Sequence, residues 1–475
     1  MRFGCVGTRT WFLKRPTLLA SVVLLTGLPM LGQTARKASS ASGCKARATN
    51  YLGWKAEELS NPWVKLEIVP QIGGRLIQVT FAGHDFLYVN PELKGKVLPL
   101  GSRGERNYGG DKIWPLPEGN QDEQHWSQAG DLDGRPFTLR VLSQGAKCAV
   151  RLTGLVNPEL GQRYIRDISI GPDSPVISFH VAMQNMSGYP QTWSEQTITE
   201  YPMSDPAGSD NFNSKFWGIT PVNATSAYPN GYRVRSGPPD NQALSSSDGL
   251  FKVHWNNVEQ EVWIDSTQGW LAAVDGSAGY TMVERRHFDP TAEYPGKATM
   301  IFYSSGEHVR RARSAAAPAA SPQPAAQNQA SGPREGPFME AEVNSPMVEL
   351  APGETYAMDT QWFPTRMGED FKTATYSGVV GTPLTATATP AGLVIAGNFG
   401  VFYAGDLVAH YYGRGGDGGT AKLLPVTPIE PVKLQITVQA PPSTSRVSVH
   451  LVDSSGVDRG PLGEALVNPP PARRQ

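Results

Sequence analysis

The chain has 475 residues, which predicts about two or three domains, each able to bury a sizeable core. Charged residues make up 18% of the sequence and the formal net charge is −1, so a nucleic-acid-binding surface is not expected. The 50 Gly, 40 Pro, 11 Trp and 16 Tyr favour a turn-rich chain dominated by β-strands.

The N-terminus has the pattern of an export signal. Basic residues precede an apolar run from residue 17 to residue 31, and small residues follow that run. We therefore predict a signal peptide over 1–41, an N-terminal linker over 42–60, and a periplasmic or extracellular location. A retained membrane anchor and lipidation at Cys44 are the alternatives. No membrane span is expected once the signal is removed.

Cysteine usage agrees with export. Cys5 lies within the signal, which leaves Cys44 and Cys148 as a pair that is a candidate disulfide in an oxidising compartment. No Cys/His spacing is typical of a zinc site, and no Cys-x-x-Cys redox motif occurs. The sequence therefore predicts neither a metal nor a cofactor.

From residue 61 onward, short alternating segments predict β-strands. Residues 64–69 alternate, a Gly-Gly pair interrupts at 73–74, and residues 76–81 alternate again. Arg75 directly follows the Gly-Gly pair, and its planar, charged guanidinium group is suited to donate two hydrogen bonds to neighbouring oxygen atoms. Its alternative role is a surface ion pair.

The segment Asn107–Glu118, NYGGDKIWPLPE, is the most distinctive of the chain. Two glycines permit a tight turn and two prolines fix φ, so we predict a rigid loop. Such a loop is suited to hold a sugar, with an indole ring on its C–H face and charged groups on its hydroxyls. A Trp that plugs the end of a β-sandwich is the alternative. The candidate sugar-binding residues here are Asp111, Lys112, Trp114 and Glu118.

Residues 176–184 show the clearest alternation. Ile177 and Phe179 share one face with two further apolar residues, and His180 lies on the polar face. His180 is a catalytic candidate if that face lines a groove, and is inert if it faces solvent. On the next alternating strand Trp193 and Glu195 share a face, and Trp193 is a further candidate for sugar binding.

Residues 312–336 are rich in Pro and Ala and have almost no large apolar side chain, which predicts a disordered insert. Because strand-like segments flank it, we place it inside one domain, 61–367. Past that domain, short strands separated by Gly/Pro/Asp turns predict a small immunoglobulin-like β-sandwich over 371–467. We expect this second sandwich to be an accessory module.

Several of these motifs, taken in order, resemble a known family. GGRLIQVTFAGHDFLYVNPEL, NYGGDKIWPLPE, ISFHVAMQN and FMEAEVNSPMVELAPGETYAMDTQW resemble a family of exported bacterial proteins that is similar to galactose mutarotase. The resemblance covers about 63–363. It implies an all-β supersandwich whose concave polar face holds a sugar.

The sequence departs from aldose epimerases at one point. They carry a histidine in an HxYFN-like segment, whereas the corresponding stretch here, 189–195, has none. Mutarotation needs a general acid and a general base within hydrogen-bond reach of the sugar. The candidates are His180 for one role and Glu195, Glu340 or Glu342 for the other.

Three classes of function therefore remain open. The first is an exported carbohydrate-binding protein, which we favour, with catalysis undecided. The second is a mutarotase-type sugar isomerase, and the third is a structural or interaction sandwich without a ligand. The expected partner is a carbohydrate and not a nucleic acid. Other chemistries on related folds have no support from the residues themselves.

Overall fold

The computed structural model describes residues 43–100, 106–117, 131–204, 212–306, 336–413 and 415–468. Within them nearly every regular element is a β-strand, which confirms the all-β prediction. The predicted signal peptide and all of the predicted insert except Gly336 lie outside the described residues, as does Glu118. Among the helices of the described ranges, none combines the length and the apolarity needed to cross a membrane.

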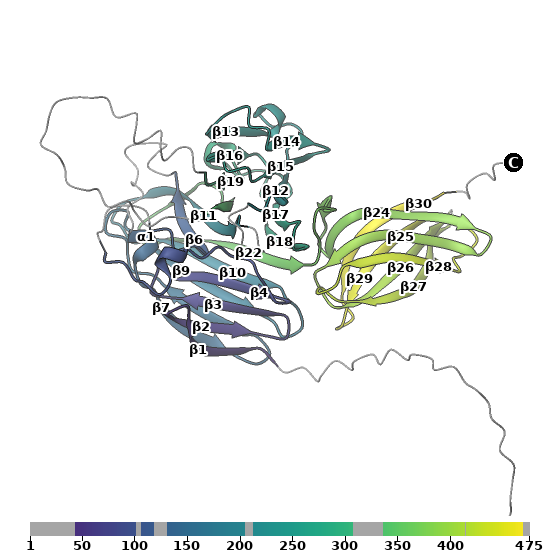
Figure 1. The fold of residues 1–475 in the computed structure, drawn as a ribbon, viewed down its shortest axis with the longest axis horizontal. Helices are drawn as coiled ribbons and strands as arrows, with labels where there is room; N and C mark the ends of the chain where they lie inside the picture. Colours follow the sequence, from purple (N-terminus) through teal and green to yellow (C-terminus); the bar gives the residue numbers. More distant parts are fainter. Residues whose placement is uncertain are drawn as a thin grey trace, which may run out of the picture. The chain divides into compact units, whose positions relative to one another are not determined.

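The first sheet has twelve strands in the described residues, and its main path runs β1-β2-β3-β4-β6-β11-β20-β19-β16-β13 (Figure 1). Off this path, β5 pairs with β4 and β21 pairs with β11. Its strands are β1 (Lys45–Tyr51), β2 (Trp54–Ser60), β3 (Val64–Val69), β4 (Arg75–Phe81), β5 (His84–Asp85), β6 (Asp111–Leu116), β11 (Gln191–Pro202), β13 (Tyr232–Ser236), β16 (Gln260–Ile264), β19 (Met300–Ser304), β20 (Phe338–Asn344) and β21 (Val348–Leu350).

The second sheet has ten strands in the order β14-β15-β12-β17-β18-β22-β10-β9-β8-β7. One large hydrophobic cluster contains buried side chains of both sheets, so the two pack as a sandwich around a common core. Two large sheets on one core agree with the predicted supersandwich. The strands of this sheet are β7 (Thr138–Ser143), β8 (Cys148–Thr153), β9 (Gln162–Ile170), β10 (Ile177–Asn185), β12 (Phe216–Pro221), β14 (Leu244–Ser247), β15 (Leu250–His254), β17 (Trp270–Asp275), β18 (Tyr280–Arg286) and β22 (Thr355–Thr365).

Local sequence patterns explain the strands that were predicted and one that was not. In β10 the alternating residues Ile177, Phe179, Val181 and Met183 are all buried, as expected of a sheet with one face on the core. Residues 42–60, predicted as a linker, instead form β1 and β2 at the edge of the first sheet. The prediction was wrong because β1 is largely exposed, so its residues lack a strong apolar alternation.

The Cys44–Cys148 disulfide joins the start of the described chain to β8, with 5.7 Å between the two Cα atoms. The backbone of Cys44 also pairs with Gly145. Helical elements are few and short in the described residues. They are α1 (Asp131–Gly134) and the 3₁₀ turns η1 (Pro91–Leu93), η2 (Pro229–Gly231) and η3 (Pro295–Lys297).

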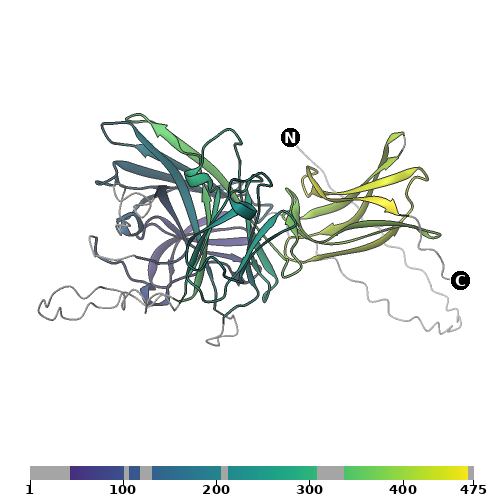
Figure 2. The ribbon, with the colours of Figure 1, turned by 90° about the horizontal axis from the view of Figure 1, so that it is seen from above.

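The C-terminal strands form a separate sheet with its own hydrophobic core. Its path is β27-β26-β29-β30-β24-β25-β28, with β23 beside β24, and it folds into the two layers visible in Figure 2. A second small sandwich therefore follows the large one. Its strands are β23 (Thr373–Ala374), β24 (Gly378–Thr389), β25 (Gly392–Val401), β26 (Gly405–Gly413), β27 (Gly416–Val426), β28 (Val432–Val438), β29 (Thr444–Asp453) and β30 (Asp458–Asn468).

Candidate functional site

Within the segment predicted as a rigid loop, residues 111–116 instead form an interior strand of the first sheet. β6 lies between β4 and β11, and residues 111–116 pair with β11. Gly109 and Gly110 lead into it with φ values of 87° and 78°. A Cβ on Gly109 would lie 2.1 Å from the carbonyl oxygen of Tyr88, so the tight entry into this strand requires glycine.

Strand alternation sends the side chains of β6 to two different faces of the sheet. Asp111 pairs in register with Thr199, and Asp111 also binds Arg166 of the second sheet, so this face is the core between the two sheets. Lys112 pairs with Ile198 and points the other way. We call that opposite side the charged face. By register and alternation its polar members include Arg75, Lys112, Gln196, Glu200, Glu261, Tyr303, Glu340 and Glu342, and Trp114, Ile198, Trp263 and Ile301 lie on the same face.

Lys112 is the centre of the charged face. Its Nζ lies 3.0 Å from Oε1 of Glu340 and 3.7 Å from Oε1 of Glu200. The same ammonium lies 4.3 Å from the centre of the Trp114 ring, which is cation–π distance. Three neighbouring strands thus bring two carboxylates, an ammonium and an indole together.

Trp114 is a structural member of this face and not a stacking platform at a groove mouth. It is 5% exposed and belongs to the main hydrophobic cluster. Its Nε1 donates to Oδ1 of Asp133 at 3.0 Å, and the same carboxylate pairs with Arg75 at 2.9 Å. The predicted role of Trp114 as an exposed sugar platform is therefore wrong.

Arg75 is also buried and is used to join strands. Besides Asp133, it donates from Nη1 to the carbonyl oxygen of Gly109 at 2.8 Å, and it lies 3.9 Å from Glu200. It has no exposed side-chain surface. Its guanidinium therefore holds the start of β6 and the helix α1 against the sheet. Because Arg75 is fully buried, it is not placed to contact sugar hydroxyls as predicted.

The charged face becomes more accessible toward β19 and β16. Glu340 retains 12% of its side-chain exposure, and Tyr303 and Glu261, aligned beside it on these two strands, are partly exposed. Glu342, two residues along β20 from Glu340, accepts a hydrogen bond from the side-chain amide of Gln196. The two carboxylates at this end are themselves largely buried, with Glu340 9% and Glu342 5% exposed, and Tyr303 is partly exposed beside them.

Burial controls the protonation of the deepest carboxylate. It raises the pKa of Glu200 to about 8, although Lys112 lowers it, and the nearby charge of Glu340 raises it further. Burial therefore disfavours the ionised form of Glu200, and the carboxyl group closest to Lys112 is that of Glu340. The carboxyl group of Glu340, 3.0 Å away, is therefore the nearest partner for the positive charge of Lys112.

Three other predicted residues lie in the core between the sheets. Asp111 pairs with Arg166 there, Trp193 is 7% exposed, and Glu195 has no exposed surface. Burial raises the pKa of Glu195 well above its ordinary value. These three side chains therefore face the core between the sheets and are not brought together with Lys112, Glu340 and Glu342 on the charged face.

His180 lies on the outer surface of the second sheet. Its side chain is 50% exposed, and its Nδ1 lies 2.8 Å from Oδ1 of Asp359 on β22. The prediction that it occupies the polar face of a strand is confirmed. That face is separated from the charged face by the core, so His180 and the candidate glutamates do not form an acid–base pair.

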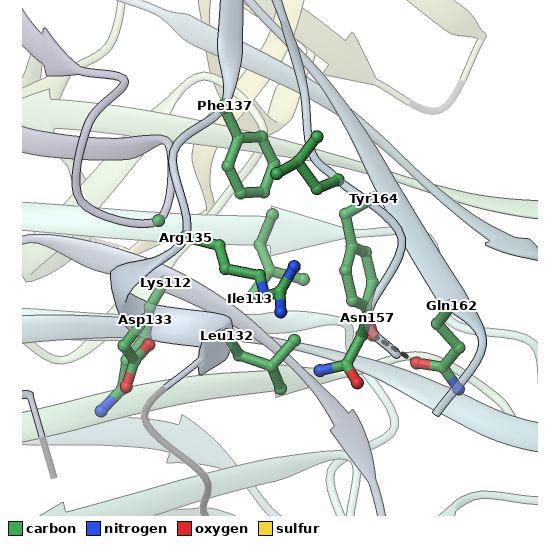
Figure 3. A pocket seen from close by; sticks show the side chains of 11 residues that line it. Lys112, Ile113, Leu132, Asp133, Arg135, Phe137, Asn157, Gln162 and Tyr164 are labelled. Atoms are coloured by element: carbon green, nitrogen blue, oxygen red, sulfur yellow. Dashed lines mark hydrogen bonds between the residues drawn. The ribbon is translucent and has the colours of Figure 1, made fainter. Parts of the chain in front are cut away.

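A small cavity lies beside Lys112 and Asp133, and Figure 3 shows the side chains that line it. It measures about 20 Å³, which is room for one water molecule. Lys112 and Asp133 border it, together with Phe137 and Tyr164.

Sequence reasoning missed Glu200, Gln196 and Asp133. A signal for the first two was present, because they continue the alternation of β11 on the face opposite Trp193 and Glu195. Asp133 belongs to α1, four residues long, and nothing in its local sequence connects it to β6. Its position depends on tertiary contacts with Arg75 and Trp114.

No protein-family model and no curated protein matches the sequence. Solved structures that resemble it include a TPR-domain containing protein from Parabacteroides distasonis, with 16% identity, 66% of this chain and 47% of that chain covered, and a TM-score of 0.43. The chain thus spans about half the length of that protein.

Slr1438 from Synechocystis sp. is a second similar structure. It has 12% identity and a TM-score of 0.43, and the match covers 70% of this chain and 99% of Slr1438. A galactose mutarotase related enzyme from Lactobacillus acidophilus has 11% identity, coverage of 66% and 98%, and a TM-score of 0.41. At these identities the likeness concerns the fold alone.

Proposed function

We propose that the protein is an exported carbohydrate-binding protein that holds its sugar at the accessible end of the charged face. The observation that carries this proposal is the Lys112 ammonium set between the carboxyl groups of Glu200 and Glu340, 3.7 and 3.0 Å away, on the sheet face opposite the core. Polyols are held by such groups, because each hydroxyl both donates and accepts a hydrogen bond. The sequence resemblance to mutarotase-like proteins adds support, since its GGDKIWPLPE motif supplies Lys112.

The groups at the accessible end define what the ligand contacts. Glu340, the more exposed of the two glutamates, accepts hydrogen bonds from sugar hydroxyls, and the ring of Tyr303 provides an aromatic surface for the C–H face of a pyranose. Trp114 and Arg75 act indirectly by holding β6 and α1 in place. The sugar therefore depends on acidic acceptors more than on basic donors.

A mutarotase-type isomerase is the second candidate. Glu340 and Glu342 lie two residues apart on β20 with both side chains on the charged face, which separates them by roughly 7 Å along the strand. Two carboxylates in different environments are a known way to supply a general acid and a general base. A polarimetric assay of anomer interconversion with the bound sugar distinguishes this candidate from simple binding.

A thermal-shift screen against monosaccharides and oligosaccharides tests the proposal. A sugar at one hundred times its Kd stabilises the native state by about 2.7 kcal/mol and must raise the Tm. The His180→Ala variant is expected to show the same shift as the wild type, because His180 is on the outer surface of the other sheet. Absence of a shift with every sugar, or its loss in His180→Ala, contradicts the assignment.

A further inference from the structure

A cluster of metal-binding side chains lies on the outer surface of the small C-terminal sandwich. His410 is on β26 and His450 on the neighbouring β29, where Val408 pairs in register with His450. Because Ala409 and Val449 on the same strands are fully buried, alternation directs both imidazoles away from the core. Two histidines thus project side by side from adjacent strands.

Asp458, the first residue of β30, completes the cluster. Its Oδ2 lies 2.8 Å from Nδ1 of His450, and its Oδ1 accepts a hydrogen bond from the backbone N–H of Gly460 at 2.8 Å. The rings of His410 and His450 stack with their centres 4.1 Å apart. One ligand atom from each of the three residues lies within 4.8 Å of the others. The carboxylate is therefore anchored beside both rings.

We propose that His410, His450 and Asp458 bind a divalent transition-metal ion, with Zn²⁺ as the reference ion. Imidazole nitrogens and a carboxylate oxygen are the ligands that Zn²⁺ takes in proteins, and solvent supplies a fourth position. Two imidazoles make the hard cations Mg²⁺ and Ca²⁺ unsuitable, since these take oxygen ligands. The site is independent of the sugar-binding proposal, which concerns the other sandwich.

To bind one ion, the three side chains must bring their ligand atoms closer together than they are in the structure. Zn–ligand distances near 2.0–2.1 Å in a tetrahedral site place ligand atoms roughly 3.3 Å apart. The side chains have room to rotate toward an ion, because 16% of the His450 side chain and 44% of the Asp458 side chain are exposed. Binding exchanges the hydrogen bond between His450 and Asp458 for two metal bonds.

Calorimetric titration of the full-length protein, without a histidine tag, with Zn²⁺ tests the proposal. We expect one saturable ion per chain and at least a tenfold weaker affinity in each of His410→Gln, His450→Ala and Asp458→Asn, since even outer-shell changes cost about 10–100-fold. His180→Ala is the matched control. It removes another exposed imidazole whose Nδ1 lies 2.8 Å from a carboxylate, but that pair is outside the cluster.

Far-UV circular dichroism and the Tm establish that each variant is folded. Wild-type affinity in the folded His450→Ala and Asp458→Asn variants, or the absence of saturable binding to the wild type, overturns the proposal. Loss of binding in His180→Ala also overturns it, because the ion would then belong to the other histidine–aspartate pair.

Discussion

Replacing Trp114 by alanine is expected to lower the free energy of unfolding by about 3–5 kcal/mol, the range for a large aromatic removed from a core. The indole is 5% exposed, donates a hydrogen bond to Asp133, and lies beneath the ammonium of Lys112. The substitution thus leaves a cavity and removes two contacts of buried charged groups. Urea denaturation followed by circular dichroism measures the loss.

Tyr189→Ala is the matched control for this prediction. Tyr189 belongs to the same sandwich, but its side chain is 59% exposed, so its removal is expected to change stability by less than about 0.5 kcal/mol. A Trp114→Ala variant with a similarly small loss would show that the indole is a surface residue, and the strand assignment of β6 would then be wrong.

Removing the Cys44–Cys148 disulfide is expected to cost up to about 4–5 kcal/mol. The bond closes a loop with a sequence separation of 104, and the chain-entropy model assigns about 4.7 kcal/mol to a loop of 100 residues. Cys44→Ala is the variant, and because Cys44 is 2% exposed, the loss of its buried sulfur adds to the measured difference. Urea denaturation of the oxidised wild type and of the variant measures the difference.

Two checks accompany the disulfide prediction. A chain that starts at residue 42, denatured without reductant, is expected to contain no titratable thiol. Addition of a reductant is expected to bring the wild type close to the stability of Cys44→Ala. Two free thiols in the unreduced chain would contradict the pairing.

The fold was predictable where local pattern and burial coincide. The alternation of residues 64–69 and of 177–183 gave strands in the correct places, because one face of each meets the core. Residues 111–116 were wrongly predicted as part of a loop, since Gly109, Gly110 and Pro115 are typical of loops. Pro115 instead lies within β6, where its position depends on neighbouring strands that the local sequence does not specify.

The sequence predicted which types of residue gather at the candidate site, but it did not predict on which side of the sheet each side chain lies. Arg75, Lys112, Trp114, Glu340 and Glu342 do gather on one side of the first sheet. Which side of each strand meets the core depends on the pairing of distant strands, and a shift of one residue reverses every side chain. This dependence explains why the core-facing residues Asp111, Trp193 and Glu195 were grouped with the site.

The role of His180 illustrates the same limit. Alternation placed it correctly on a polar face, but the sequence did not assign its strand to the second sheet. Its partner Asp359 is 179 residues away in the chain. A polar face of a strand is therefore compatible with either a groove or bulk solvent until the sheet order is known.

The most direct test of the account is a calorimetric titration of the best sugar from the screen into Glu340→Gln. A hydrogen bond to a charged group contributes about 1.5–3 kcal/mol, so we expect the affinity to fall roughly tenfold or more. Glu349→Gln is the control, because Glu349 is exposed on β21 and should bind the sugar as the wild type does. A folded Glu340→Gln variant with wild-type affinity would contradict sugar binding at the charged face.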